Sequence, residues 1–330
     1  MAQRVVFHIG LMKSGTTFIQ GRLNANRERL AEQRVLFPGP TWNRHVRAVS
    51  DLLGSPKRKA GSWNSLAEEI REYDGTAVVS MEYLAPAGAR QISVLRESFP
   101  GCELRVAVTV RDLGRTVPAM WQEAIKNRRT WEWQEYVGSI EQGGDAGRRF
   151  WRQQHAAKIA RRWGSTLGAG HVYVVTVPPA GAPSGLLWDR FCEVAGIRPD
   201  SWADGPRANE SLGAASTLVM RRLNFSTRDL PLPAYKKRVK ALAKHVMGSH
   251  RAAEDPIGFT VPPWLHGESE KITAQLARSG AHVVGDLAEL APVDVVGVDP
   301  AAVGEGAQLE ASVAALTGVL NQVRQVRRTA

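Results

Sequence analysis

The chain has 330 residues, enough for one large α/β domain with an added piece or for two small domains. Its hydrophobic fraction of 43% is ordinary for a globular protein, and no apolar run approaches the roughly 20 residues that span a bilayer. The only two cysteines, Cys102 and Cys192, argue against a disulfide framework, and the net charge of +11 favours anionic ligands.

The sequence also indicates where the protein is located and which partners it lacks. The opening residues, MAQRVVFH, run directly into a predicted strand and show no signal-peptide pattern, so we expect a cytoplasmic protein. The basic clusters are dispersed and carry no interleaved aromatic residues, so we expect no nucleic-acid partner. The eight histidines form no pair at a metal-binding spacing, so we expect no metal.

Apolar, β-branched runs alternate with helical patterns along the chain. The runs lack polar alternation, which predicts strands buried on both faces of a parallel sheet. Strand and helix in alternation predict an α/β fold with a parallel central sheet flanked by helices. The five runs are VVFHI near residue 5, AVVS at 77, LRVAVTV at 104, VYVVTV at 172 and AHVVG at 281.

The first strand leads into HIGLMKSGTTFIQ, a glycine-containing turn followed by a predicted helix. Such a turn directs free N–H groups and the positive end of the helix dipole toward an anion. Lys13 adds a full charge and the hydroxyls add donors, so we predict a phosphate site here. The predicted contacts are Gly10, Lys13, Ser14, Gly15, Thr16 and Thr17.

This turn differs from the nucleotide-binding loop of P-loop NTPases. That loop has the pattern G-x-x-x-x-G-K-[ST]. Aligned on Lys13, the pattern requires glycine at Phe7 and Met12, and neither is glycine. Here the glycine, Gly15, follows the Lys-Ser pair.

The second half of the chain divides into three predicted segments. Residues 200–275 are mostly helical and basic, residues 291–307 form a linker, and residues 308–330 form a C-terminal helix. That helix has apolar residues at alternating spacings of four and three, as in a coiled coil. We expect this seam to pack on the domain, with a homodimer as the alternative. The seam residues are Leu309, Val313, Leu316, Leu320 and Val323.

The turn after the first strand resembles the 5′-phosphosulfate-binding loop of bacterial sulfotransferases that use 3′-phosphoadenylyl sulfate (PAPS). That loop has the form K-[ST]-G-T-[TS] and follows a strand, as Lys13 to Thr17 do here. The resemblance implies a P-loop NTPase-like fold of the sulfotransferase type over residues 1–290. It also implies PAPS as sulfuryl donor and adenosine 3′,5′-bisphosphate (PAP) as product.

A second stretch, TVRDLGRTVPAMWQEAIKN, resembles the family's 3′-phosphate motif. The motif has an Arg at a strand end and a Ser eight positions later. Arg111 fits, whereas Ala119 replaces the Ser. The resemblance implies that Arg111 binds the 3′-phosphate. The alternative is a surface Arg that pairs with Asp112.

A third stretch, TAVVSMEYLAP, lies at the strand end where this family carries its catalytic base. Glu82 resembles the glutamate base of several carbohydrate sulfotransferases. Glu82 could instead cap the helix that follows. His45, in a loop after FPG, is the rival base.

The later segment RANESLG resembles a polar stretch of bacterial relatives, so Asn209 and Ser211 are further candidates for the nucleotide site. The resemblance implies in-line sulfuryl transfer from PAPS to a hydroxyl or amine of a small-molecule, sugar or lipid acceptor. Lys13 would stabilise the leaving phosphate. Two alternatives remain at this point: an ATP-dependent kinase with Asp112 or Asp286 as metal ligand, and a catalytically inactive nucleotide-binding protein.

Overall fold

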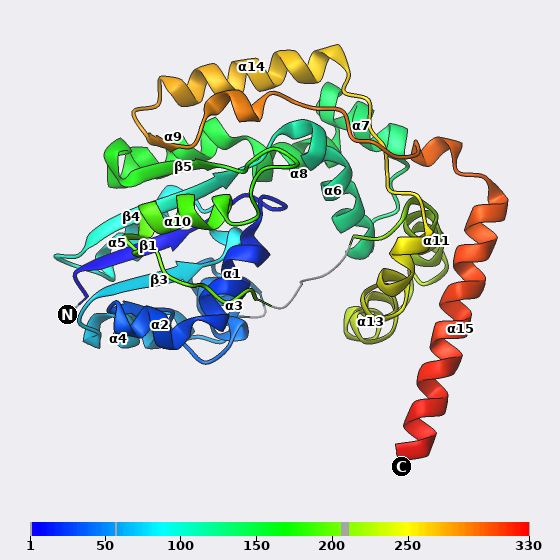
Figure 1. The fold of residues 1–330 in the computed structure, drawn as a ribbon, viewed down its shortest axis with the longest axis horizontal. Helices are drawn as coiled ribbons and strands as arrows, with labels where there is room; N and C mark the ends of the chain where they lie inside the picture. Colours follow the sequence, from blue (N-terminus) through cyan, green and yellow to red (C-terminus); the bar gives the residue numbers. More distant parts are fainter. Residues whose placement is uncertain (1, 57, 206–210, 330) are drawn as a thin grey trace. The chain divides into compact units, whose positions relative to one another are not determined.

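The computed structural model describes residues 2–56, 58–205 and 211–329 (Figure 1). The chain forms two compact units whose segments alternate along the sequence. Unit 1 comprises Met1–Asp112, Trp151–Ala208 and Gly267–Ala291, and unit 2 comprises the remaining segments. Unit 1 ends at Ala291, and the predicted domain 1–290 and its helical part, 200–275, each include residues of both units.

Unit 1 contains all the strands of the described chain. Its sheet consists of β1 (Arg4–His8), β2 (Val35–Leu36), β3 (Thr76–Ser80), β4 (Glu103–Val110), β5 (Val172–Thr176) and β6 (His282–Val284). Its α-helices are α1 (Thr16–Ala25), α2 (Arg27–Glu32), α3 (Trp42–Leu52), α4 (Ser62–Glu72), α5 (Ala89–Glu97), α9 (Ala156–Leu167) and α10 (Leu186–Ala195). Two further helices, α8 (Asp145–Gln154) and α14 (Pro263–Ala277), cross from one unit to the other along the chain.

The six strands form one sheet in the order β2-β3-β1-β4-β5-β6, and every strand pair is parallel. Figure 1 shows the strands as arrows that point in one direction, with helices as their connections. The predicted α/β class is therefore confirmed. The five apolar runs are strands, and β2, which the sequence analysis missed, has only two residues.

Alternate residues of β1 explain how helices cover both faces of the sheet. Val6 packs in a buried cluster with side chains of α1, α2 and α10. Its neighbour Phe7 points to the opposite face, where its ring contacts Phe99 at 5.9 Å between centroids. Phe99 in turn contacts Trp63 of α4 at 6.1 Å. A fully buried strand of this kind gives the continuous apolar run seen in the sequence.

Unit 2 is built from helices and irregular chain. Its helices are α6 (Leu113–Lys126), α7 (Trp133–Gln142), α11 (Ala214–Ser226), α12 (Leu232–Tyr235), the π-turn η3 (Lys236–Lys240), α13 (Ala241–His245), η4 (Met247–Ala253), η6 (Pro300–Ala302) and α15 (Glu305–Thr329). Among the described residues, no helix combines the length and the apolar character needed to cross a bilayer.

Buried polar side chains connect α6 to α11 in unit 2. Asn224 of α11 donates from Nδ2 to the carbonyls of Ile125 and Arg129, at 2.8 Å each. The Tyr235 hydroxyl donates to Asn224 Oδ1 at 2.7 Å. Because Asn224 is buried, these bonds satisfy an amide that would otherwise destabilise the core by about 1–3 kcal/mol.

The segment 291–307, predicted as a linker, pairs through its backbone with residues 256–259. Val295 exchanges two backbone hydrogen bonds with Phe259, both at 2.9 Å. Val298 forms an isolated parallel β-bridge with Ile257. The helix α15 then begins at Glu305, before the predicted start at residue 308. The β-branched valines of this segment favour the extended pairing.

The expected packing of the C-terminal apolar seam is wrong. Leu309, Leu316 and Leu320 are 66%, 66% and 62% exposed, whereas Ala311 and Ala315 are buried. Figure 1 shows α15 lying along α11, and contacts between the two helices agree with this. Small side chains allow close helix approach, so α15 packs through its alanine face and leaves the leucines outward. The homodimer stays a prediction.

Candidate anion site at the carboxyl ends of the central strands

The predicted phosphate loop lies at the centre of the unit 1 sheet. Its strand, β1, lies between β3 and β4 and runs parallel to both. After β1 the chain forms β2 and β3 on one side of this strand, and then β4, β5 and β6 on its other side. The direction in which strands are added therefore reverses at β1. In open parallel sheets such a switch point is where ligands bind, at the carboxyl ends of the strands.

The loop itself is held in a tight turn. Leu11 N–H donates to the Thr109 carbonyl at 3.0 Å, which extends the β1–β4 pairing into the loop. Ser14 N–H donates back to the Leu11 carbonyl at 3.2 Å. Lys13 and Gly15 have φ of 67° and 84°, in the left-handed region. A left-handed conformation costs a lysine about 1–3 kcal/mol, and such residues cluster at functional sites.

The loop ends at the N-terminus of α1, where several backbone donors remain available. The N–H groups of Gly15, Thr16 and Thr17 donate no hydrogen bond to any residue that the structure describes. Thr17 is exposed and Lys13 is half-buried. Consecutive free N–H groups together with the helix dipole form a site that favours an anion.

Beneath the loop, four buried side chains form a chain of hydrogen bonds. His8 Nδ1 lies 2.8 Å from Ser80 Oγ, and His8 Nε2 lies 3.3 Å from Thr109 Oγ1. Thr109 Oγ1 lies 2.7 Å from Ser14 Oγ, which donates to the Leu11 carbonyl at 2.5 Å. The four side chains are fully buried or nearly so.

The carbonyl at the end of this chain fixes the direction of every proton. A carbonyl can only accept, so the Ser14 hydroxyl donates to Leu11 and accepts from Thr109. Thr109 then accepts from His8 Nε2–H, and His8 Nδ1 accepts from Ser80. Burial lowers the pKa of His8 to about 3, so the ring is neutral as this order requires.

This arrangement assigns the predicted hydroxyls different tasks. The Ser14 hydroxyl faces inward and closes the loop, and Thr16 Oγ1 also points to the Leu11 carbonyl, at 3.4 Å. Thr17 is the exposed hydroxyl of the three. Gly10 lies against the chain: a Cβ there would lie 2.1 Å from Thr109 Oγ1. Glycine is therefore required at position 10 for steric reasons.

Two further side chains fix the loop from outside its own sequence. Arg111, the first residue after β4, donates from Nη1 to the Lys13 carbonyl at 3.4 Å. Gln154, a buried residue, donates from Nε2 to the Met12 carbonyl at 2.9 Å. The structure therefore brings the Arg111 side chain and the Lys13 backbone together.

Glu82 lies at the end of β3, beside the helix that begins at the loop. Its Oε2 accepts from Gln20 Nε2 at 3.4 Å, and the same amide donates to the Ser80 carbonyl at 3.3 Å. Glu82 begins the short helix η1 (Glu82–Leu84), but its carboxylate caps no helix in the described chain. The half-buried carboxylate is held at the strand end, where a base could act.

His45, the rival base, is a core residue of α3 rather than a loop residue. Its side chain is fully buried, and Nε2–H donates to the Pro38 carbonyl at 2.8 Å. Nδ1 accepts from Ser80 N–H at 3.4 Å, so both ring nitrogens are engaged. Burial is the main cause that lowers the pKa of His45 to about 4. The hypothesis of His45 as the base is therefore wrong.

The remaining predicted positions belong to unit 2 or lie outside the described residues. Asn209 lies outside the described residues, and Ser211 belongs to unit 2, half-buried ahead of α11. Ala119 also belongs to unit 2, in the second turn of α6. Among the described residues, no three His, Cys, Asp or Glu side chains are grouped as metal ligands.

Sequence reasoning missed the buried hydrogen-bond chain, although the sequence holds a signal for it. His8 and Thr109 are polar residues within apolar strands, in VVFHI and LRVAVTV. A polar residue at a strand's carboxyl end in such a run requires a buried partner. The partners Ser80 and Ser14 could not be named, because they are 72 and 95 residues away from His8 and Thr109 respectively.

Comparison with solved structures gives a structural likeness. The chain is similar to a solved sulfotransferase from Alicyclobacillus acidocaldarius, at 13% sequence identity and a TM-score of 0.40. The match covers 70% of this chain and 98% of that one. No protein-family model and no curated protein matches the chain. At this identity and TM-score, the likeness carries no inference about ligands or activity.

Proposed function

We propose that the protein is a PAPS-dependent sulfotransferase. The observation that carries the proposal is the loop after β1: three N–H groups that donate to no described residue, Lys13 in a left-handed turn, and Arg111 bonded to the Lys13 carbonyl. This set combines two cations with backbone donors at adjacent strand ends. A nucleotide with phosphates at both its 5′ and 3′ positions matches two such cations.

The reaction is an in-line displacement at sulfur. An acceptor hydroxyl or amine forms the new bond to sulfur while the bond to the bridging oxygen of the 5′-phosphate breaks. The electron pair of that bond leaves with PAP. Lys13 and the N–H groups of the loop stabilise the growing negative charge, and a preorganised donor of this kind is worth about 10²–10³ in rate.

Glu82 is the proposed base. Its half-buried carboxylate accepts only from Gln20 among the described residues, so one carboxylate oxygen can take the acceptor's proton. Gln20 belongs to the helix that starts at the loop, so it fixes the base relative to Lys13. General-base catalysis of this type contributes about 10²–10⁴ in rate.

Arg111 is the proposed ligand of the 3′-phosphate. A guanidinium binds phosphate through two parallel charge-assisted hydrogen bonds, which distinguishes PAPS from ATP. Its contact with the Lys13 carbonyl would couple recognition of the 3′-phosphate to the position of the loop.

The experiment is transfer from [³⁵S]PAPS to a panel of a phenol, monosaccharides and a glycolipid. We expect a labelled product with at least one acceptor class and equal release of PAP, both lost in Lys13→Ala. An ATP-dependent kinase would instead transfer from [γ-³²P]ATP with Mg²⁺. Transfer from ATP and none from PAPS would overturn the proposal.

A further inference from the structure

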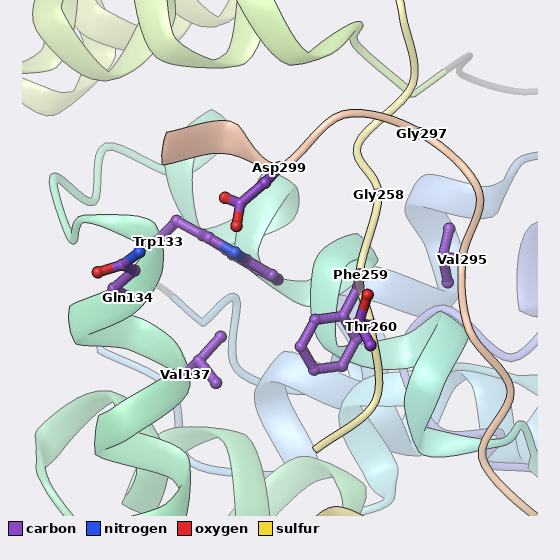
Figure 2. Close-up of a pocket in the computed structure, with 9 residues that line it drawn as sticks. All are labelled: Trp133, Gln134, Val137, Gly258, Phe259, Thr260, Val295, Gly297 and Asp299. Atoms are coloured by element: carbon purple, nitrogen blue, oxygen red, sulfur yellow. The ribbon is translucent and has the colours of Figure 1, made fainter. Parts of the chain in front are cut away.

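Unit 2 contains a groove lined by its own residues. It has a volume of about 430 Å³, within the usual range for small-molecule sites, which is about 300–1,000 Å³. Figure 2 shows side chains from α7 on one side and from two extended segments on the other. The lining residues are Trp133, Gln134, Val137, Gly258, Phe259, Thr260, Val295, Gly297 and Asp299.

One wall of the groove is rigid backbone. Phe259 and Val295 exchange hydrogen bonds at 2.9 Å, and Gly258 N–H donates to the Val298 carbonyl at 2.9 Å. The two segments cross at Gly258 and Gly297, where a Cβ on Gly258 would lie 2.4 Å from the Gly297 carbonyl oxygen. Glycine allows this approach, and the groove is therefore formed before any ligand arrives.

The opposite wall is aromatic. The Trp133 ring meets Phe259 edge-on at 5.4 Å between centroids and Trp121 at 5.3 Å. Trp133 is 7% exposed, yet its indole Nε1–H donates to no residue in the described chain. The Nε1 atom itself is not buried, so this donor is open to the groove and can bond to a ligand or to water.

Asp299 supplies an acceptor beside that donor. Its Oδ1 accepts from Ala301 N–H at 2.8 Å, and its second oxygen accepts from none of the described residues. Figure 2 shows the carboxylate directed toward the Trp133 indole, and no hydrogen bond joins the two groups. The groove therefore presents one unused donor and one unused acceptor next to aromatic rings.

These groups define the chemistry of the ligand. None of the described residues that line the groove is Lys or Arg, so an anion would meet the Asp299 carboxylate without compensation. An ammonium ion could donate to Asp299 but could not accept from Trp133 Nε1–H. A hydroxyl does both. We propose that this groove binds a neutral polyhydroxylated molecule, a monosaccharide, whose C–H faces pack against Trp133 and Phe259.

The experiment is saturation-transfer NMR on the full chain, with D-glucose, D-galactose and N-acetyl-D-glucosamine as probes and choline as the cationic comparison. We expect saturable binding of at least one sugar. Asp299→Asn keeps the Oδ1 cap and removes the charge, so binding should weaken by about 10-fold. Trp133→Phe keeps a ring and removes the donor, so binding should weaken by about 2- to 10-fold.

Asp286→Asn is the matched control, because Asp286 caps a 3₁₀-helix with the same 2.8 Å bond, to Ala288 N–H, and does not line the groove. It should leave sugar binding unchanged. If Trp133→Phe fails to fold, sugar binding by Asp299→Asn alone decides the test, because Asp299 is exposed and its substitution should not affect folding. No saturable sugar binding, binding of choline alone, or equal sugar affinity in wild type and Asp299→Asn would each overturn the proposal.

Discussion

The loop after β1 and the groove of unit 2 offer opposite chemistry to a ligand. The loop presents backbone N–H groups, Lys13 and Arg111, with a neutral hydrogen-bond chain below. Among its described lining residues, the groove presents aromatic rings, one carboxylate and no cation. One region is suited to phosphates and the other to hydroxyls.

The two regions also differ in whether backbone or side-chain groups would contact the ligand. At the loop, donors come from backbone geometry, since the inward Ser14 hydroxyl is used to close the turn. At the groove, donor and acceptor are side chains fixed by packing and by a cap. Substitutions at the loop should therefore affect nucleotide use and leave sugar binding alone.

The largest expected effect is at Glu82. Glu82→Gln keeps the shape of the side chain and removes the base, so turnover should fall by about 10²–10⁴ while PAP affinity stays the same. Turnover is measured with [³⁵S]PAPS and affinity by calorimetry. The exposed Glu97→Gln serves as control. Normal turnover in Glu82→Gln would remove this residue from the catalytic site.

Lys13 tests the charge of the loop against its shape. Lys13→Ala should lower turnover by about 10²–10³. Lys13→Gly accepts the left-handed φ of 67° without strain. It should therefore be at least as stable as Lys13→Ala and equally inactive. Thermal melting and turnover are measured on both, with the exposed Lys59→Ala as control. Recovery of activity in Lys13→Gly would show that loop shape, not charge, matters.

Arg111 tests recognition of the second phosphate. Arg111→Met removes a charge-assisted contact worth about 1.5–3 kcal/mol, so PAP should bind roughly 10- to 100-fold more weakly. ADP, which lacks the 3′-phosphate, should change little. Calorimetry with both nucleotides checks this. Equal losses for PAP and ADP would mean that Arg111 acts only through the Lys13 carbonyl.

Gly10 tests the close packing beneath the loop. Gly10→Ala brings a Cβ to 2.7 Å from His8 Nε2 and closer still to Thr109 Oγ1. The free energy of unfolding, measured with urea, should fall by about 1–3 kcal/mol. Gly138→Ala, in the open interior of α7, should be neutral or stabilising by about 0.5–1 kcal/mol. A fully stable Gly10→Ala would contradict the packing described here.

The last expected effect, which is smallest near neutral pH, is the pH dependence that His8 confers on unit 1. Its folded pKa of about 3 lies below the unfolded value of 6.5, so only the unfolded state binds a proton between these values. Stability is therefore complete above about pH 6.5 and falls as pH drops toward 3. His8→Asn should reduce the slope of unfolding free energy by up to about 1.4 kcal/mol per pH unit. An unchanged slope would mean that His8 is not buried neutral.

Much of the fold of unit 1 can be predicted from short-range patterns in the sequence. Apolar β-branched runs predicted five strands, and the turn around Lys13 was predicted because Gly10, Lys13 and Gly15 lie close together in the sequence. Contacts made across the sheet could not be predicted. His45 reads as a loop residue in sequence, yet it packs in α3 with its nitrogens bonded to Pro38 and Ser80.

Unit 2 followed less well from the sequence. The spacing of Leu309, Leu316 and Leu320 suggested a packed seam, but the alanine face of α15 is the buried one. Periodicity identifies a helix and its apolar stripe without saying which stripe a neighbour covers. The groove depends on a crossing between Gly258 and Gly297, 39 positions apart in the sequence, which no local pattern signals.

Calorimetric titration of the full chain with PAP, in buffer containing a metal chelator, tests the central claim most directly. The account predicts saturable binding of one PAP per chain, with ADP at least about 10-fold weaker because it lacks the 3′-phosphate. Absence of PAP binding, or binding of ATP only when Mg²⁺ is supplied, would contradict the assignment of the Lys13 loop to PAPS.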